Sequence, residues 1–339
     1  MAPPERTLRL RSGTALRLPL LVPSVSSAGF KQRLLADGSR QPEAAFWFQV
    51  LAPFLSKALL ISAYDIHHGL LPDVAELHGD FERSIYSGGR VLFIDSGVYE
   101  QVHGPPPHDG CRLGWDYETF EALIGSLDRS SGAIVVNYDL YGAFGDQIAA
   151  AQRFFATHEH FSSDLLLKPE ACGQPLDIDS LTKDISALRG FDIIGVTEKE
   201  LGDSLLEKLR ALRKLRSRMT EAGVHAPIHV FGSLDPVLAP LYHAAGAEIF
   251  DGLSWLRFGY AWQVSLYKEQ VAILEDEQDL SRGKDDRDLT MLVNNALALG
   301  ALNERMRQFA NTGEWGLFDP RVANRLESAY RALTTSTGA

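Results

Sequence analysis

IHVFGSLDPVLAPLYHAAGAEIFDGLSWLR, residues 228–257, is the stretch that decides the fold. Its first apolar run ends at Gly232, and Asp235 then opens a helical segment that closes at Gly246. A second short apolar run follows this helix and ends at Asp251. The order strand, turn, helix and strand predicts a β/α unit with a carboxylate at the C-terminal end of its second strand. Barrels and doubly wound sheets of such units keep their chemistry at that end of the strands.

The same unit recurs along the chain. Short apolar runs that predict strands, each followed by a turn and a helical pattern, occupy residues 19–23, 58–62, 91–94, 133–137, 165–168, 191–194, 227–231 and 247–250. The predicted helices occupy residues 44–56, 72–83, 116–128, 146–158, 178–188, 202–222, 235–244 and 255–275. Strands that alternate with helices predict a parallel sheet, and eight of them are the number in a closed (β/α)8 TIM barrel. An open doubly wound sheet is the alternative, although six strands are more usual there.

Two segments lie outside this repeat. Residues 98–115 carry three consecutive prolines after the third strand and predict a long loop on the face where loops carry function. Residues 276–339 begin with an acidic, polar linker, and two helical patterns follow at 286–309 and 319–334. The sequence therefore predicts a catalytic barrel over residues 1–275, with a C-terminal helical extension that packs on it.

The composition limits the class of protein. The chain has 339 residues, a formal net charge of −11 and only two cysteines, Cys111 and Cys172. This charge argues against a protein that coats nucleic acid through a generally basic surface. So few cysteines exclude a disulfide scaffold and suit a reducing compartment. No segment has the length and apolarity of a membrane span, and the N-terminal residues lack the apolar core of a signal peptide. We therefore expect a cytoplasmic enzyme without a membrane partner.

One helix could still provide a local basic surface. The run KLRALRKLRSRM, residues 208–219, places six Lys and Arg side chains on one predicted helix. Such a run can contact phosphates. A solvated barrel helix whose leucines face the sheet has the same pattern, and this second interpretation is favoured. The pair His67 and His68 has no evident third ligand, so no metal site is predicted there.

Acidic side chains follow several of the predicted strands, where the loops of a barrel carry its chemistry. Three of them, at comparable positions, are Asp95, Asp139 and Asp251. Further charged residues near strand ends are Lys168, Glu170 and Glu198. Several acids at one rim raise each other's pKa and can divide into acid, base and nucleophile roles. A single acid at a strand end can instead cap the next helix, and the spacing alone leaves both interpretations open.

The residues around these acids resemble motifs of the tRNA-guanine transglycosylase family. FIDSGVYE, residues 93–100, resembles its DSGGYQ-type motif, and IFDGLSWLR, residues 249–257, resembles its MFDCVLPTR segment. Three further stretches are similar to its first, second and sixth strand motifs, in the same order: LLVPSVSSAGF (20–30), ALLISAYDIHHG (58–69) and IIGVTEKELGDS (193–204). The resemblance covers about residues 19–260. It implies a barrel enzyme that exchanges a base on a polynucleotide.

The resemblance implies a chemical role for each of the three acids. Asp251 would be the nucleophile that attacks the anomeric carbon of the sugar and forms a covalent glycosyl–enzyme intermediate. Asp95 would be the general acid and base that serves the departing and the arriving base. Asp139 would accept hydrogen bonds from the exocyclic amine and the ring N–H of a guanine-like base.

Further matching residues would line the base pocket. Tyr99 matches the aromatic residue on which the base stacks. Gly195 matches the strand-end glycine whose backbone touches the base. Ser96 and Gly97 belong to the turn of the DSGGYQ-type motif. The resemblance therefore places the base between the turns that follow the third and sixth strands.

Several positions depart from the family pattern. The family typically holds a zinc ion with three cysteines and a histidine shortly after the nucleophile, but no cysteine follows Cys172 in this chain. That zinc site cannot exist in this form, and no metal or cofactor is expected. Val98 and Glu100 replace the second glycine and the glutamine of the DSGGYQ-type motif. Lys168 or Glu170 is nearest to the position of the family's pocket glutamine.

The expected partners are a guanine in tRNA or DNA and an incoming 7-deazaguanine base, because relatives of the family modify either polynucleotide. An N-glycosidase or hydrolase of a free nucleoside is an alternative that the acidic net charge and the missing zinc element favour. A non-catalytic paralogue that serves as a transglycosylase subunit is another, which the presence of Asp95 and Asp251 opposes. The resemblance is compatible with a homodimer or with a partner subunit.

Overall fold

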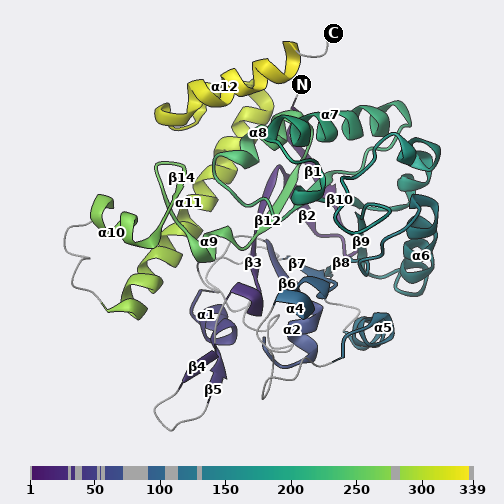
Figure 1. Cartoon of the computed structure of the whole chain (residues 1–339), viewed down its shortest axis with the longest axis horizontal. Helices are drawn as coiled ribbons and strands as arrows, with labels where there is room; N and C mark the ends of the chain where they lie inside the picture. The colour runs from purple at the N-terminus through teal and green to yellow at the C-terminus, as the bar shows by residue number, and fades with distance from the viewer. Residues whose placement is uncertain are drawn as a thin grey trace.

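Eight parallel strands form a closed barrel in the computed structural model, and helices surround it (Figure 1). The structure describes residues 2–29, 32–34, 40–51, 54, 58–71, 91–103, 114–127, 132–275 and 283–335. The barrel strands are β3 (Leu20–Val25), β6 (Ala58–Ser62), β7 (Val91–Asp95), β8 (Ile134–Val136), β9 (Ser162–Leu167), β10 (Ile193–Thr197), β11 (Ile228–Phe231) and β12 (Ile249–Gly252). They follow one another around the ring in chain order, and β12 pairs with β3 to close it. The predicted (β/α)8 TIM barrel is therefore confirmed, with all of its predicted strands present.

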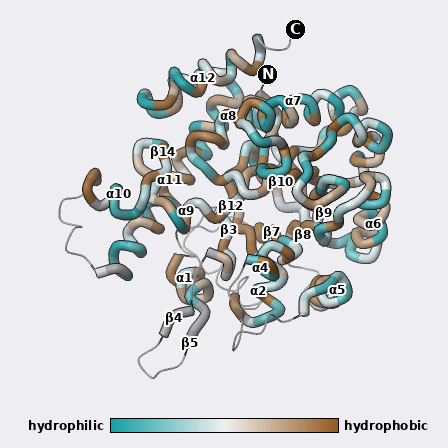
Figure 2. Tube along the Cα trace, viewed as in Figure 1, coloured by the Kyte–Doolittle hydropathy of each residue, from teal (hydrophilic) through white to brown (hydrophobic). Residues whose placement is uncertain are grey.

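Alternation along the strands divides their side chains between the two faces of the barrel wall. Leu20 and Phe93 belong to a buried cluster inside the barrel, whereas their neighbours Leu21 and Leu92 belong to the cluster between strands and helices. Figure 2 shows hydrophobic residues along the central strands and more hydrophilic ones on peripheral helices such as α7 (Leu205–Glu221). In β3, β7 and β12 the inward positions change from apolar to polar toward the C-terminal ends of the strands, which bear Ser24, Asp95 and Asp251.

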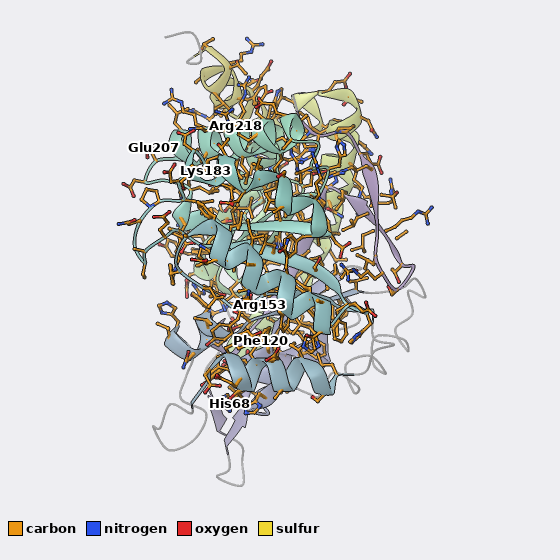
Figure 3. All side chains as sticks on the ribbon, turned by 90° about the vertical axis from the view of Figure 1, so that its right-hand side faces the viewer. His68, Phe120, Arg153, Lys183, Glu207 and Arg218 are labelled. Carbon is orange, nitrogen blue, oxygen red and sulfur yellow. The ribbon has the colours of Figure 1, made fainter. Side chains whose placement is uncertain are left out.

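Helices connect the strands and cover the outside of the barrel. They include α1 (Glu43–Leu51), α2 (Ala63–His67), α4 (Val98–His103), α5 (Tyr117–Ser126), α6 (Phe144–Thr157) and α8 (Leu238–Ala245). Ser204 and Glu207 form a capping box that starts α7, and this helix buries its leucines toward the sheet. Figure 3 shows the labelled side chains of Arg153, on α6, and Glu207 at the outer surface.

Three predicted helices differ from the structure or lie outside the described residues: 72–83, 178–188 and 255–275. The helix predicted over residues 178–188 is replaced by two 3₁₀ helices, Ser180–Lys183 and Ile185–Gly190. The helix predicted over residues 72–83 lies outside the described residues, as do residues 104–113 of the predicted 98–115 loop. The described start of that loop is the short helix α4.

The segment after β12 is not the single helix predicted over residues 255–275. It forms α9 (Ser254–Arg257), an antiparallel hairpin of β13 (Gly259–Ala261) and β14 (Val264–Leu266), and α10 (Lys268–Glu275). Trp262 and Gln263 make the two-residue turn of this hairpin, with positive φ angles of 49° and 61°. Such turns usually carry Asn or Gly at these positions, so no hairpin signal is visible in the sequence.

A second hairpin, β1 (Arg6–Arg9) and β2 (Ala15–Leu18), closes the N-terminal mouth of the barrel. Leu10, Leu16 and Leu18 belong to the same buried cluster as the inward side chains of the barrel strands. Arg6 forms an ion pair of 2.6 Å with Glu248, which directly precedes β12. Leucines thus seal one mouth of the barrel, which leaves the C-terminal mouth for polar chemistry.

The C-terminal helices α11 (Lys284–Thr312) and α12 (Pro320–Thr335) pack on the side of the barrel (Figure 1). α11 contacts β3, α9 and β13, and α12 contacts α7 and α8. The side-chain oxygen of Asn303, on α11, accepts a hydrogen bond of 3.0 Å from the backbone N–H of Leu21 in β3. None of the helices in the described ranges is both long and apolar enough to cross a bilayer.

Candidate active site

Asp251, the penultimate residue of β12, lies inside the C-terminal mouth, where three groups surround its carboxylate. Ser24 of β3 donates its hydroxyl to Oδ2 at 2.8 Å, and the backbone N–H of Gly232 donates to Oδ1 at 3.0 Å. Nε2 of His229, in β11, lies 3.3 Å from Oδ1. Asp251 is only 5% exposed, so its oxygens depend on the two hydrogen bonds from Ser24 and Gly232 and on the electrostatic contact with His229. The orientation of the carboxylate is therefore fixed from three different directions.

His229 links Asp251 to a second carboxylate deeper in the barrel. Its Nδ1 lies 2.6 Å from Oδ2 of Asp164, in β9, and both side chains are completely buried. The ring of Phe231 stacks on the imidazole at a centroid distance of 3.8 Å, and Phe93 meets it edge-on at 5.6 Å. Burial opposes a charge on the ring, but the carboxylates of Asp164 and Asp251 outweigh it and raise the pKa of His229 to about 9.

Gly195 of β10 makes room for this row of side chains. A methyl group in place of its hydrogen would lie 2.6 Å from the ring of Phe231 and 3.0 Å from Oδ1 of Asp164. Carbon atoms in comfortable contact are about 3.5–4.0 Å apart, so a side chain here would displace the ring or the carboxylate. The structure therefore shows a packing reason for this glycine, and contact of its backbone with a base stays a prediction.

Asp95, at the end of β7, has a very different environment from Asp251. Burial raises the pKa of Asp95 well above its ordinary value, and the negative charges of Asp139, Glu100 and Asp251 raise it further. The influence of Asp251 on this pKa means that the two acids lie within electrostatic reach of each other. Asp251 is surrounded by hydrogen-bond donors, whereas carboxylates act on Asp95. Two acids in such different environments can take different roles, one as a nucleophile and the other as a proton donor.

Asp139, which follows β8, is tied to the strands on both sides of it. Ser96 donates its hydroxyl to Oδ1 at 2.7 Å, and Nζ of Lys168 lies 3.4 Å from Oδ2. Lys168 is buried, and its Nζ also reaches Glu200 at 2.9 Å and the hydroxyl of Thr197 at 3.3 Å. Burial lowers the pKa of Lys168, but the two carboxylates outweigh it and raise the value. The structure thus brings three of the sequence-predicted residues into direct contact.

The turn after β7 supports an exposed aromatic ring. Gly97 has a φ of +84°, and a methyl group on it would lie 2.5 Å from Cβ of Tyr64. This position therefore requires glycine. Tyr99, in α4, is 40% exposed, and its ring centroid lies 4.6 Å from that of His103. An exposed tyrosine with one supported face can stack on a planar ligand.

Two buried carboxylates lie behind this turn. Glu100 accepts a hydrogen bond of 2.5 Å from Ser26, and Asp65 accepts two from Ser27, at 2.5 Å from the hydroxyl and 2.7 Å from the backbone N–H. Burial, assisted by the charge of Asp65, raises the pKa of Glu100 to about 7. Burial likewise raises the pKa of Asp65 to about 7. Each of them is only partly ionised at neutral pH, which limits the negative charge around Asp95.

Other charged residues near strand ends have structural partners or face solvent. Glu198 accepts a hydrogen bond of 2.7 Å from Tyr242 and forms an ion pair of 2.8 Å with Lys208, whereas Glu170 is exposed. The basic run of α7 forms four ion pairs with acids: Lys208–Glu198, Lys214–Asp179, Arg216–Glu248 and Arg218–Glu221. These pairs agree with the interpretation of α7 as a solvated barrel helix. In the described ranges, no group of three or more His, Cys, Asp or Glu side chains is arranged to hold a metal ion.

Around Asp251, three side chains were not predicted from the sequence: Ser24, Asp164 and His229. The sequence nevertheless contains a feature that points to His229 and Asp164. His229 lies within the predicted strand 227–231, and Asp164 directly precedes the predicted strand 165–168. Parallel strands of a barrel are covered on both faces, so an ionisable side chain inside one of them needs a partner.

Comparison with known proteins adds no family assignment to this geometry. Neither a scan against protein-family models nor a search of curated proteins finds a match for the chain.

Proposed function

We propose that the chain is a transglycosylase that replaces guanine in a polynucleotide with a 7-deazaguanine, through a covalent glycosyl intermediate on Asp251. One observation carries the proposal. Asp251, among hydrogen-bond donors, and Asp95, with its raised pKa, occur at the same mouth of the barrel. These two environments suit a nucleophile and a proton donor. The ordered motifs that resemble the tRNA-guanine transglycosylase family supply the class of reaction.

In the first half of the proposed reaction, Asp251 attacks C1′ of the sugar while the C1′–N9 bond to guanine breaks. Asp95 gives its proton to the departing base, so guanine leaves as a neutral molecule. In the second half, Asp95 accepts the N9 proton of the incoming base, whose nitrogen attacks C1′ and releases the Asp251 carboxylate. The fixed orientation of Asp251 lowers the entropic cost of reaching the attack geometry.

Recognition of the base is assigned to groups beside these two acids. The carboxylate of Asp139 suits the two adjacent N–H donors on the edge of guanine. Ser96 and Lys168 hold this carboxylate in place. Tyr99 offers a stacking surface, which every purine and 7-deazapurine can use. A guanine inside a helix would have to leave the stack to reach this mouth.

A hydrolase or N-glycosidase of a free nucleoside is a second candidate. The ion pairs along α7 favour it, because they present a largely neutralised helix to phosphates. The net charge of −11 points the same way, since an acidic protein repels a polyanion at long range.

A base-exchange assay with labelled guanine tests the proposal. The purified chain is incubated with tRNA, with DNA and with free guanosine in parallel. We expect label to enter one of the two polynucleotides. Release of guanine from guanosine alone would support the second candidate. Binding of a 7-deazaguanine base without any turnover would instead indicate a non-catalytic subunit, as a paralogue of the family.

The Asp251→Asn variant tests the nucleophile. We expect it to lose the adduct that survives denaturation, while a base still binds, because an amide cannot attack C1′ but occupies the same space. The Asp95→Asn variant is the matched comparison, since its Asp251 is intact. Full turnover by Asp251→Asn would remove the mechanism.

A further inference from the structure

We propose that His229 is a positioning residue for Asp251, and that it acts as an imidazolium held between the carboxylates of Asp164 and Asp251. The assignment of His229 as an ion rests on geometry alone. Its consequence for catalysis rests on the proposed function of Asp251. Separate experiments therefore test the ion and its consequence.

Both ring nitrogens of His229 face carboxylate oxygens. Nδ1 lies 2.6 Å from Asp164, and Nε2 lies 3.3 Å from Asp251. A neutral imidazole carries one N–H, so its other nitrogen would point a lone pair at a carboxylate. Only the doubly protonated ring presents a donor to each acid. The alternative is a proton on one of the carboxyl groups, which the same experiment detects.

The surroundings of the ring prevent water from taking over either role. His229 and Asp164 are completely buried, and the ring of Phe231 covers one face of the imidazole at 3.8 Å. Gly195 admits this ring, since any side chain there would clash with it. Nε2 is buried, and no group in the described part of the chain meets hydrogen-bond geometry with it. It does lie within ion-pair distance of Asp251, at 3.3 Å.

The charged groups that face the imidazole come from the strands on either side of it. Asp164 approaches from β9, across Gly195 of β10, and Asp251 approaches from β12. The charge of Asp251 in turn contributes to the raised pKa of Asp95 of β7. A single positive charge thus lies between two acids. This arrangement places a cation against the carboxylate that attacks in the proposed reaction.

The charge on His229 also suits the intermediate of the proposed reaction. Formation of the glycosyl ester consumes the negative charge of Asp251. The remaining pair, Asp164 and His229, is then neutral overall and can stay buried without a further partner. The ring can therefore keep both of its protons throughout the proposed reaction.

Nitrogen NMR of the uniformly ¹⁵N-histidine-labelled full chain tests the ion. We expect both nitrogens of His229 to be protonated at neutral pH and to remain so up to a pH of about 9. The signal is assigned by its loss in His229→Gln. Asp164→Asn should lower the pKa of the ring, because it removes one of the two facing charges. A ring with a single N–H at pH 7 would overturn the assignment, whatever the enzyme does.

His243 is an internal control in the same spectra. It is also completely buried, but its Nδ1 contacts a backbone carbonyl, that of Ala247, at 2.8 Å instead of a carboxylate. Burial therefore lowers the pKa of His243 to about 4. It should show one protonated nitrogen across the neutral range.

The separate values of kcat and KM test the positioning role. In Asp164→Asn and His229→Gln, kcat should fall while KM for the base changes little, because the cation that faces Asp251 is disturbed or removed and the groups assigned to the base are intact. We expect at least a roughly tenfold loss of kcat. A rise in KM as large as the loss of kcat would overturn the role, since general damage to packing would also disturb binding of the base. A wild-type chain with a doubly protonated ring and no base exchange would overturn the proposed function and leave the ion established.

Discussion

The hydroxyl of Ser96, directly after β7, donates a hydrogen bond of 2.7 Å to Asp139, which follows β8. The other oxygen of Asp139 faces the ammonium group of Lys168, so the carboxylate is held from both sides. The plane of the Asp139 carboxylate is therefore set before any ligand arrives. If Asp139 accepts two N–H groups of a base at once, a carboxylate that is already oriented loses less entropy on binding and so increases the affinity for the base.

Ser96→Ala should weaken binding of the base without loss of the fold. Without the hydroxyl, Asp139 can rotate about its side-chain bonds and must be ordered again on binding. We expect KM for guanine to rise up to about tenfold, within the range of a hydrogen bond to a charged group. Ser126→Ala is the control, because Ser126 is exposed and its hydroxyl donates to a backbone carbonyl of its own helix. Equal KM values in the two variants would contradict the holding role of Ser96.

Asp95→Asn should reduce kcat by about 10²–10⁴-fold, the usual range for a general acid. Burial and the neighbouring carboxylates raise the pKa of Asp95 well above its ordinary value, so its protonated form extends to higher pH than that of an ordinary aspartate. Its ability to protonate the departing base is lost as pH rises through that pKa. The basic limb of the wild-type kcat profile should therefore disappear in the variant. A basic limb that persists in Asp95→Asn would assign the acid to another residue.

Glu100→Gln should stabilise the fold at alkaline pH. The pKa of Glu100 is about 7 in the folded protein, against an ordinary value of 4.5. Its contribution to stability is fully present below pH 4.5 and is lost as pH rises through 7. Glutamine imitates the neutral form, so urea unfolding at a pH of about 8.5 should give a gain of up to about 3 kcal/mol. Near pH 4.5 the two proteins should have similar free energies of unfolding.

Glu118→Gln is the control, because Glu118 is exposed and its substitution should not change the stability in a pH-dependent way. A gain of equal size at both pH values in Glu100→Gln would refute ionisation of Glu100 as the cause.

Gly195→Ala should destabilise the barrel by about 1–3 kcal/mol, the usual cost of an extra group in a packed interior. The added methyl would meet the ring of Phe231 at 2.6 Å. Gly300→Ala is the matched control, since it lies within α11 and nothing would contact its methyl group within 4 Å. That change should stabilise the helix by about 0.5–1 kcal/mol. Chemical denaturation of both variants measures the difference, and similar stabilities would mean that the barrel interior can relax.

Tyr99→Ala should weaken base binding by about 1–3 kcal/mol, the value of one stacking contact. The side chain is 40% exposed, so its removal should leave the melting temperature nearly unchanged. Tyr267→Ala is the control, because Tyr267 is 66% exposed and precedes α10, after the β13–β14 hairpin. Calorimetric titration with guanine compares the two variants. Unchanged affinity in Tyr99→Ala would place the stacking surface elsewhere.

The barrel could be predicted because its strands are covered on both faces. Each strand therefore appears as a short, nearly continuous apolar run, and the alternation of these runs with helices leaves few arrangements. The positions of Asp95 and Asp251 at one mouth follow from the same topology, because parallel strands end on the same side. No knowledge of side-chain packing was needed for either inference.

The partners of Asp251 could not be predicted in the same way. Ser24 and Asp251 are 227 residues apart, and they meet because of the register in which β12 pairs with β3. That register depends on the shear of the closed barrel, which no local pattern encodes. The β13–β14 hairpin was missed for a local reason, because Trp262 and Gln263 are not typical turn residues.

The contact between Ser24 and Asp251 lies across the seam at which the ring closes. Ser24 belongs to β3, the first barrel strand to be synthesised, and Asp251 belongs to β12, the last one. Asp251 therefore acquires its hydroxyl donor only after β12 has been synthesised and has paired with β3. A nascent chain thus cannot contain the completed site, and neither could two half-barrels expressed as separate polypeptides. Recovery of the site upon mixing such halves would report directly on the docking of β12 against β3.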